Sequence, residues 1–253
     1  MISIVICSID RRRFEKVARE YARVMGGEPF EIIGIHDAQS MSEGYNRGFA
    51  MSSGEMVVFS HDDIEFWVGD LAGRLKGLLG VGGVGVVDVV GVAGTNRLCG
   101  PQWVTAGAPY TFGVVPQVLP DGRIRVMMFG SPRRLVEGIQ ALDGVFLACR
   151  REVAEKVAWD AVTFDGFHHY DLDWTYRAFR AGFRLGVAVD LPILHMSGGT
   201  IDETWRNSAP RFLEKHAGTM RMMFREFAMA RVSVGSRDEA MEVLGEIYKW
   251  LDR

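Results

Sequence analysis

The first sixty residues alternate between apolar runs and amphipathic segments, and this order leaves few folds open. Residues 2–7, 31–35 and 56–59 are short apolar runs rich in β-branched side chains, which is typical of strands buried on both faces. Residues 14–24 carry apolar side chains at helical spacing, and Ser40 opens a capping-box pattern for a second helix. This order predicts a doubly wound α/β domain with a mostly parallel, mixed central sheet and flanking helices.

The rest of the chain is expected to complete this sheet and then to leave it. Further helices are expected over residues 71–79, 150–158 and 171–181, and further strands over 84–92, 142–149 and 184–189. Residues 100–134 are rich in aromatics, prolines and glycines, which with a turn at 120–123 predicts a β-rich excursion. We therefore assign residues 1–205 to one domain and residues 206–253 to a helical extension that packs on it.

The extension ends in a predicted amphipathic helix. Ser236 and Glu239 form a second capping box. The apolar residues after it fall on one helical face: Met241, Leu244, Tyr248 and Leu251. The methionine-rich residues 220–225 are interpreted as packing for this tail, and peripheral contact with a partner or a membrane surface is the alternative.

Composition and charge exclude several classes of protein. Apolar residues make up 48% and charged residues 24% of the 253 residues, so the chain is not mainly disordered. The 29 basic and 32 acidic residues give a net charge of −3, which argues against a nucleic-acid partner. Three scattered cysteines form no CxxC pair, and residues 1–7 lack the features of a secretory signal. We therefore expect a soluble, cytoplasmic protein without disulfides.

One glycine-rich segment imitates a dinucleotide-binding motif. Residues 80–85 (GVGGVG) fit G-x-G-x-x-G, but that motif requires a strand before it and a helix after it. Here a helical segment comes first and a strand is expected to follow, so we interpret the glycines as close packing. A Walker P-loop is absent from the sequence, which argues against a simple ATPase or kinase.

An acidic pair follows the third predicted strand. Asp62 and Asp63 come directly after residues 56–61, and doubly wound sheets bind ligands at the carboxyl ends of their strands. Carboxylates at this place are suited to hold Mg²⁺ or Mn²⁺ against a diphosphate, because hard cations take oxygen ligands. The alternative is a turn or a helix cap with solvated aspartates.

A second acidic group opens the helix predicted over residues 171–181. Asp171 and Asp173 lie in its first turn, where free N–H groups favour negative charge, and Arg177 follows four residues after Asp173. One interpretation is capping together with an Asp173–Arg177 ion pair. The other makes one carboxylate a general base that takes the proton of a substrate hydroxyl.

Histidines are the remaining candidates. His195 closes the apolar run of residues 191–194 and precedes a glycine-rich loop. It is either a hydrogen-bonded core residue or a ligand, and the loop favours a ligand. His168 and His169 would point in opposite directions on an extended segment, so we do not expect them to hold one metal.

Three sequence blocks and one histidine occur in an order typical of one enzyme family. The first block runs from Ser40 through Asn46 to Asp63, the second covers residues 142–151, and the third runs from Phe164 to Arg184. They resemble the N-x-G helix with its D-x-D strand, and the E-D-x-D block, of the GT-A glycosyltransferases, specifically the family-2-like nucleotide-sugar transferases. His195 stands where that family commonly has a histidine after its last sheet strand.

The resemblance implies a fold, a reaction and a metal. A GT-A domain of this kind would move a sugar, with inversion, from a nucleoside-diphosphate sugar to a hydroxyl of a saccharide or glycoconjugate. A UDP sugar is the favoured donor, and polysaccharide biosynthesis the expected context. Asp63 and His195 would bind the divalent metal, Mn²⁺ or Mg²⁺. Asp171 would be the catalytic base.

The resemblance also implies a set of residues that bind the nucleotide sugar: Asp37, Asn46, His61, Asp62 and Gly144. The chain departs from the family at two of its motif positions. His61 replaces the first aspartate of D-x-D, so Asp62 could take over its contact with the ribose. Tyr170 replaces the glutamate that precedes the catalytic base.

Two other functions stay open. A nucleotidyltransferase would make a sugar nucleotide, although the chain lacks the glycine-rich basic loop expected near the N-terminus. A non-catalytic sugar- or nucleotide-binding module with a degraded site would explain His61 and Tyr170. Sugar transfer requires that Asp63, Asp171 and His195 line one cavity. The sequence leaves open the donor sugar, the acceptor and the oligomeric state.

Overall fold

The computed structural model describes residues 1–80, 85–130, 133–199, 201–220, 222 and 229–251. Most of the glycine-rich segment at 80–85, and most of the methionine-rich segment at 220–225, lie outside the described residues. Within the described part of the chain, we find no helix that combines the length and the apolar character needed to cross a bilayer.

The central sheet is mixed, as predicted. Seven strands of the described chain follow the order β2-β1-β3-β11-β5-β12-β9. β1 (Ile2–Cys7) pairs in parallel with β2 (Phe30–Ile35) and with β3 (Met56–Ser60). β11 (Phe146–Arg150) runs antiparallel between β3 and β5 (Val89–Gly91), and β12 (Leu185–Ala188) is parallel to β5. β9 (Leu135–Ile139) closes the edge.

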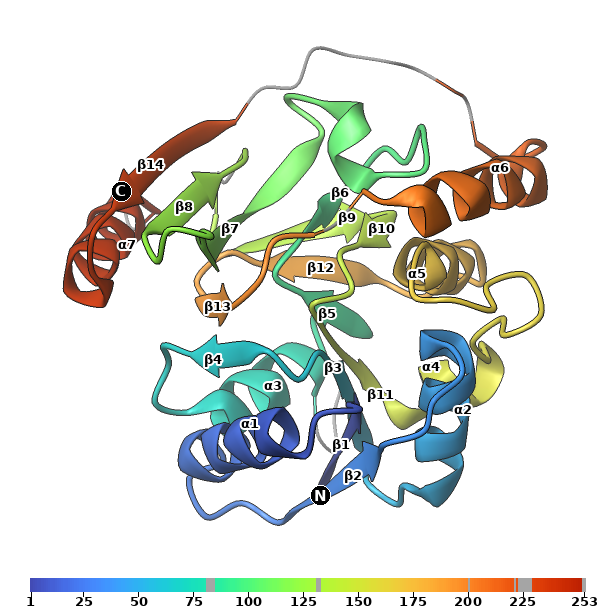
Figure 1. Ribbon diagram of the computed structural model, residues 1–253, viewed down its shortest axis with the longest axis horizontal. Helices are drawn as coiled ribbons and strands as arrows, with labels where there is room; N and C mark the ends of the chain where they lie inside the picture. The colour runs from blue at the N-terminus through green and yellow to red at the C-terminus, as the bar shows by residue number, and fades with distance from the viewer. Residues whose placement is uncertain (81–84, 131–132, 200, 221, 223–228, 252–253) are drawn as a thin grey trace.

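Helices cover both faces of this sheet (Figure 1). Helices α1 (Arg11–Val24) and α3 (Leu71–Leu79) cover one face, and α2 (Met41–Met51) and α4 (Arg151–Lys156) cover the other. Alternating side chains explain the arrangement, because Ile4 packs in the core beneath α1 and Val5 in the core beneath α2. A Cβ at Gly48 would overlap Val5, so this glycine lets α2 lie close to β1.

The capping predictions at Ser40 and Ser236 are confirmed, and Asp10 caps a further helix. The Asp10 carboxylate accepts hydrogen bonds from the N–H groups of Arg12 and Arg13 at the start of α1. The Ser40 hydroxyl accepts from Glu43 N–H at the start of α2. Ser236 does the same for Glu239 at the start of α7 (Arg237–Leu251). Each cap satisfies an N–H that the helix leaves without a partner.

A second sheet lies beyond the edge at which the parallel strands β1 and β3 of the first sheet end (Figure 1). Its strands follow the order β10 (Ala141–Leu142), β6 (Ala93–Thr95), β7 (Thr111–Val118), β13 (Ile193–His195) and β4 (Ile64–Phe66). β7 also forms a hairpin with β8 (Ile124–Met128), which follows the expected turn at 120–123. A short 3₁₀ helix (Trp103–Ala106) precedes β7. The β-rich excursion predicted for residues 100–134 therefore builds one wall above the central sheet (Figure 1).

The tail returns to this wall. Helix α6 (Glu203–His216) packs against α5 (Tyr170–Arg180), and α7 packs near β8 (Figure 1). The proposed division at residue 205 falls inside α6. The tail also contains β14 (Ala230–Val234), an additional strand that pairs with β8.

Two expected strands and one helical face differ from the prediction. The strand expected over 142–149 is interrupted by residues 143–145, where Asp143 accepts the N–H of Val145 and turns the chain. The strand expected over 84–92 is reduced to Val89–Gly91, because Val86 and Val87 donate their N–H groups to α3 instead. On α7, Leu244 is buried as expected, whereas Met241 is 42% exposed.

Candidate active site

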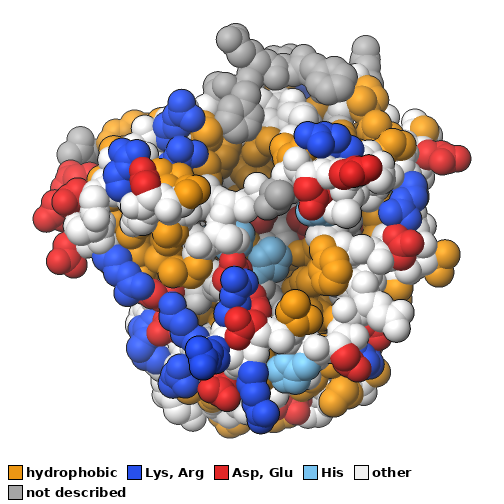
Figure 2. Space-filling model, viewed as in Figure 1, with side chains coloured by type: hydrophobic (Ala, Val, Ile, Leu, Met, Phe, Trp, Pro, Cys, Tyr) orange, Lys and Arg blue, Asp and Glu red, His pale blue; other side chains and the backbone are white. Residues whose placement is uncertain are grey.

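A cleft of about 680 Å³ opens between the central sheet and the second sheet. It is lined by the chain after β1, the chain after β3, the β10–β11 loop, the start of α5 and the end of β13. Figure 2 shows this hollow near the middle of the molecule, with histidine side chains inside it. The three residues on which the predicted function depends, Asp63, Asp171 and His195, all line it.

Strand pairing brings Asp63 and His195 together. β4 begins directly after Asp63 and pairs antiparallel with β13, which places Ile64 opposite His195. The N–H of Met196 also donates to the carbonyl of Asp63 over 2.8 Å. Two segments that are 132 positions apart in the sequence are therefore fixed side by side by backbone hydrogen bonds.

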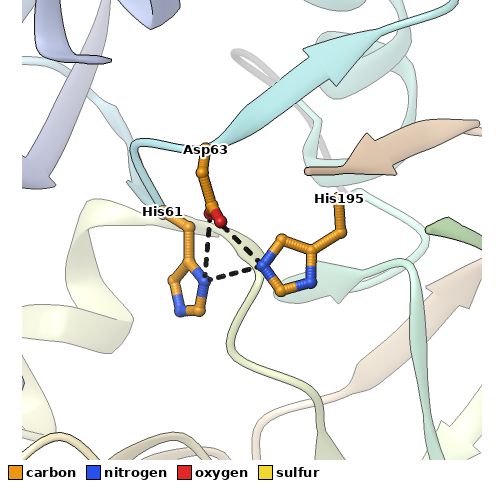
Figure 3. Close-up of side chains that lie close together, drawn as sticks. All are labelled: His61, Asp63 and His195. Carbon is orange, nitrogen blue, oxygen red and sulfur yellow. Dashed lines mark hydrogen bonds and ion pairs between the residues drawn. The ribbon is translucent and has the colours of Figure 1, made fainter. Parts of the chain in front are cut away.

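His61, Asp63 and His195 form a compact cluster of possible metal ligands (Figure 3). The Nε2 of His195 lies 3.2 Å from the Oδ1 of Asp63, and the Nδ1 of His61 lies 3.9 Å from the same oxygen. The two ring nitrogens are 3.5 Å apart. Ligand atoms at about 2.1 Å from one ion lie about 3 to 3.5 Å from each other, so this donor set fits a divalent cation after small adjustments.

The protonation states of this cluster also suit a cation. Burial lowers the pKa of His61 to about 4, and the neighbouring His195 adds to this effect. Burial opposes the charge of Asp63, but the hydrogen bond from His195 keeps the pKa of Asp63 well below its ordinary value. His61 is therefore a neutral imidazole and Asp63 a carboxylate near neutral pH, which are the forms that bind metals.

Asp62 points to a different partner from Asp63. Its Oδ2 accepts a 2.6 Å hydrogen bond from the hydroxyl of Ser8, which follows β1. Burial raises the pKa of Asp62, although the bond from Ser8 acts in the opposite direction. Asp62 lines the cleft beside the cluster, but the three residues of the cluster do not include it.

The Asp171 carboxylate is held at the other side of the cleft. Its Oδ2 accepts a 2.8 Å hydrogen bond from the N–H of Gly144. A Cβ at Gly144 would lie 2.7 Å from the Cβ of Asp171 and 2.7 Å from the Tyr170 hydroxyl, so only glycine fits there. Burial, and then the nearby Asp143 carboxylate, raises the pKa of Asp171. A carboxylate with a raised pKa is a stronger base when it is ionised.

Asp173 has a structural role instead. It is fully buried, and its carboxylate meets Arg177 at 2.8 Å, Lys215 at 2.6 Å and His216 at 3.0 Å. The predicted Asp173–Arg177 pair is confirmed, and the network joins α5 to α6. Of the two carboxylates that open α5, only Asp171 lines the cleft.

Two residues expected to bind the nucleotide sugar lie elsewhere. Asp37 is largely exposed and pairs with Arg47 at 2.6 Å. The side-chain amide of Asn46 donates to, and accepts from, the backbone of Trp159, which ties α2 to the chain after α4. Neither residue is among those that line the cleft. The remaining residues of that set, His61, Asp62 and Gly144, do line it.

His168 and His169 bind other side chains. His168 meets Asp202 at 3.3 Å, and the buried His169 meets the Ser208 hydroxyl at 2.6 Å. Both residues line the cleft, but neither belongs to the cluster of possible metal ligands.

Sequence reasoning missed Ser8 and Asp143, which hold or face the predicted site residues. Asp143 accepts hydrogen bonds from the indole of Trp103 and from the N–H of Val145. Its position directly before Gly144 in the second block was the available signal. Ser8 gave none, because its contact with Asp62 spans 54 positions.

Comparison with known proteins shows the family and the fold. A family model described as "Glycosyltransferase like family" matches residues 3–223. Among solved structures, the mannosyltransferase PcManGT from Pyrobaculum calidifontis, in complex with GDP-Man and Mn²⁺, has a TM-score of 0.51 and 10% identity. The match covers 88% of this chain, which in turn spans 65% of that protein. The predicted GT-A type of fold is thereby confirmed.

Two other solved structures are less similar. A197 from STIV has a TM-score of 0.42 at 12% identity, over 79% of this chain and 96% of that protein. GalNAc-T7 with UDP, GalNAc and Mn²⁺ has a TM-score of 0.46 at 11% identity, over 85% of this chain and 47% of that protein. No curated protein sequence matches the chain.

Proposed function

Because the chain belongs to the glycosyltransferase-like family, we propose that it is an inverting, metal-dependent transferase. It would move a sugar from a nucleoside-diphosphate sugar to a hydroxyl group of a saccharide or glycoconjugate. The observation that carries this proposal is the single cleft shared by the His61–Asp63–His195 cluster and the Asp171 carboxylate.

The charge of the cleft supports a metal-bound diphosphate. Its described lining contains four carboxylates, Asp62, Asp63, Asp143 and Asp171, whereas Arg13 is the one arginine or lysine among the described lining residues. A diphosphate that entered without a cation would meet mainly like charges, which raise its free energy in a partly buried site. A divalent ion held by His61, Asp63 and His195 would reverse this balance.

The metal would supply charge stabilisation for the departing diphosphate, which is worth several kcal/mol. The chain's own contribution is to fix two of the ligands, Asp63 and His195, through the pairing of β4 with β13. The sugar carbon would then face Asp171 across the same cleft. No protonated side chain is needed at the leaving group, in contrast to a glycoside hydrolase.

Asp171 would accept the proton of the acceptor hydroxyl. Such a hydroxyl is a weak nucleophile, so a positioned base must remove its proton as it attacks. The hydrogen bond from the N–H of Gly144 to Oδ2 orients the Asp171 carboxylate for this task. The nearby Asp143 carboxylate would strengthen Asp171 as a base through its negative charge.

Aromatic side chains form part of the cleft wall. They are Trp103, Phe129, Phe167 and Trp205. A binding site that combines apolar walls with a few polar groups is typical of small organic ligands. We propose that this part receives the saccharide or glycoconjugate acceptor.

Thermal shift with a panel of nucleoside diphosphates, each with and without Mn²⁺, tests the donor site. We expect one nucleoside diphosphate, with UDP the favoured candidate, to raise the melting temperature of the protein only when Mn²⁺ is present. The active arm incubates the protein with the matching nucleotide sugar and simple acceptors, and a parallel arm uses a nucleoside triphosphate with a sugar phosphate. Product only in the parallel arm would identify a nucleotidyltransferase, and binding without product in either arm would favour a non-catalytic module.

A further inference from the structure

The two positions at which the chain departs from the glycosyltransferase motifs touch each other. His61 stands for the first aspartate of D-x-D, and Tyr170 stands for the glutamate before the catalytic base. The Nε2 of His61 lies 2.8 Å from the hydroxyl oxygen of Tyr170, across 109 positions of sequence. If the two motifs had lost their family residues independently, there would be no reason for the two replacing side chains to form a hydrogen bond with each other.

We propose that His61 and Tyr170 act as a unit in which Tyr170 orients His61 as a third metal ligand, and that this imidazole makes the site prefer Mn²⁺ over Mg²⁺. The proposal rests on the proposed function, because it assigns a metal preference to the same site. Tyr170 is a positioning residue here, since it acts on the metal through His61.

The hydrogen bond selects the nitrogen of His61 that faces the metal. With its proton on Nε2, the imidazole donates to the Tyr170 oxygen and keeps a lone pair on Nδ1. That Nδ1 is the atom that lies 3.5 Å from His195 Nε2 and 3.9 Å from Asp63 Oδ1. Metal-bound histidines commonly donate their second N–H in this way, which fixes the ring and its tautomer.

Tyr170 is itself held firmly enough to do this. Its side chain is buried, with 4% of the residue exposed. Its ring packs against Trp159 and Tyr45, each with a centroid 5.9 Å away. The partner of His61 is therefore held in one place by its burial and by these two rings.

The donor set explains the expected metal preference. His61 and His195 offer nitrogen atoms, and Asp63 is the carboxylate of the cluster. Imidazole nitrogens suit transition metals, whereas Mg²⁺ takes oxygen ligands in a near-ideal octahedron. An aspartate in place of His61 would restore an oxygen donor and weaken this preference, because only the nitrogen of His195 would remain.

The first test measures Mn²⁺ binding in the absence of any sugar donor. Isothermal titration of the metal-stripped protein compares the wild type with Tyr170→Phe, which deletes only the hydroxyl. We expect the affinity for Mn²⁺ to fall about 10- to 100-fold, as is typical when the partner of a ligating residue is lost. Unchanged affinity would overturn the positioning role.

Tyr45→Phe is the matched control. Tyr45 belongs to the same aromatic cluster and is fully buried, and its hydroxyl has no hydrogen-bond partner among the described residues. We expect wild-type Mn²⁺ affinity from this variant. An equal loss in Tyr45→Phe and Tyr170→Phe would assign the effect to packing and contradict the proposal.

The second test addresses the metal preference. We expect His61→Asp to lower the ratio of Mn²⁺ affinity to Mg²⁺ affinity by about tenfold or more. A ratio equal to that of the wild type would reject the preference. If His61→Asp does not fold, electron spin-echo spectroscopy of Mn²⁺ bound to the wild-type protein replaces this test. We expect two nitrogens directly bound to Mn²⁺. A single bound nitrogen would reject His61 as a ligand.

The result is independent of whether the proposed transfer reaction occurs. If Mn²⁺ binding depends on Tyr170 but no nucleotide sugar is used for transfer, the positioning role of Tyr170 is supported and the proposed transferase function is rejected. If transfer occurs but Tyr170→Phe leaves the Mn²⁺ affinity unchanged, the transferase function is supported and the positioning role of Tyr170 is rejected.

Discussion

The Asp171 carboxylate accepts a hydrogen bond from the backbone N–H of Gly144, 2.8 Å away and 27 positions earlier in the sequence. The proposed base is therefore oriented by the loop that separates β10 from β11, and not only by its own helix. Because this donor is a backbone group, its position depends on the close approach of the loop to α5. Changes in either partner are expected to act on the same catalytic step.

Asp171→Asn should abolish transfer while donor binding is kept. The amide retains an oxygen that accepts the Gly144 N–H, but it cannot take a proton from the acceptor. Loss of a general base typically lowers kcat about 100- to 10,000-fold. Steady-state kinetics and titration with the nucleoside diphosphate plus Mn²⁺ measure the two effects.

Asp165→Asn is the control for Asp171→Asn, because Asp165 is exposed and pairs with Arg211 outside the cleft. We expect wild-type turnover from this control. Wild-type turnover of Asp171→Asn itself would reject Asp171 as the base.

Gly144→Ala should damage both stability and activity. The added Cβ would stand 2.7 Å from both the Asp171 Cβ and the Tyr170 hydroxyl, so the loop and α5 must separate. Overpacking of this kind costs about 1 to 3 kcal/mol. Gly166→Ala is the matched control, because no atom lies within 4 Å of its added Cβ. Denaturant unfolding and kcat/KM report both effects, and equal behaviour of the two variants would contradict the predicted contact.

The raised pKa of Asp171 predicts opposite pH trends for activity and stability. Burial and the Asp143 charge raise this pKa to about 7, so the base becomes ionised, and kcat/KM increases, as the pH rises through about 7. The folded protein holds this proton more tightly than the unfolded chain does. The stabilisation from Asp171 is therefore complete below about pH 4 and is lost as the pH rises toward 7.

Asp171→Asn should remove this pH dependence of stability. Relative to the wild type, the variant is expected to gain melting temperature at pH 8 compared with pH 5. Melting curves of the two proteins across this range, recorded without metal, measure the difference. A constant difference across the range would show that Asp171 titrates normally.

Much of the central sheet could be predicted from the sequence because its signals are local. The apolar run from Ile2 to Cys7 and the cap at Ser40 each act within a few residues. β4 and β14 gave no such signal. β4 has three residues and exists because it pairs with β13, more than 120 positions later, and most of β14 is exposed and pairs only with β8 in the described structure.

The candidate site divides in the same way. The placement of Asp63, Asp171 and His195 in one cleft could be predicted because motif order marks each of them separately. The contact of His61 with Tyr170 depends on the relative placement of β3 and α5, which no local pattern encodes. Asn46 has a motif-like sequence, but its amide is used by the Trp159 backbone, and only tertiary structure reveals such a use.

Removal of the metal should weaken donor binding without unfolding the protein. None of the three cluster residues belongs to the hydrophobic core. The pairing of β4 with β13 holds Asp63 and His195, and the N–H of His61 donates to the carbonyl of Val145. A chelator is therefore expected to lower affinity for the nucleoside diphosphate at least tenfold, because the four cleft carboxylates then face it directly. Added Mn²⁺ should restore nucleoside diphosphate binding in the wild-type protein but not in the Asp63→Asn variant. An affinity for the nucleoside diphosphate that is the same with and without the chelator would contradict a metal-bound diphosphate.

Asp173→Ala should be among the most destabilising single changes at the α5–α6 contact. The variant leaves Lys215 and His216 of α6, and Arg177 of α5, without the buried carboxylate that they share. Removing one partner of a buried ion network costs about 3 to 5 kcal/mol. Denaturant unfolding of the metal-free protein measures this loss.

The exposed pair between Asp165 and Arg211 is a control for Asp173 within the same contact. It also connects the chain beside α5 to α6, at 2.8 Å, but its side chains are 66% and 41% exposed. Surface pairs of this kind contribute about 0 to 1 kcal/mol, so Asp165→Ala should change stability little. Burial, rather than the number of ion pairs, then determines how firmly α6 is attached to the catalytic domain. Equal losses from the two variants would show that the Asp173 network is as weak as a surface pair.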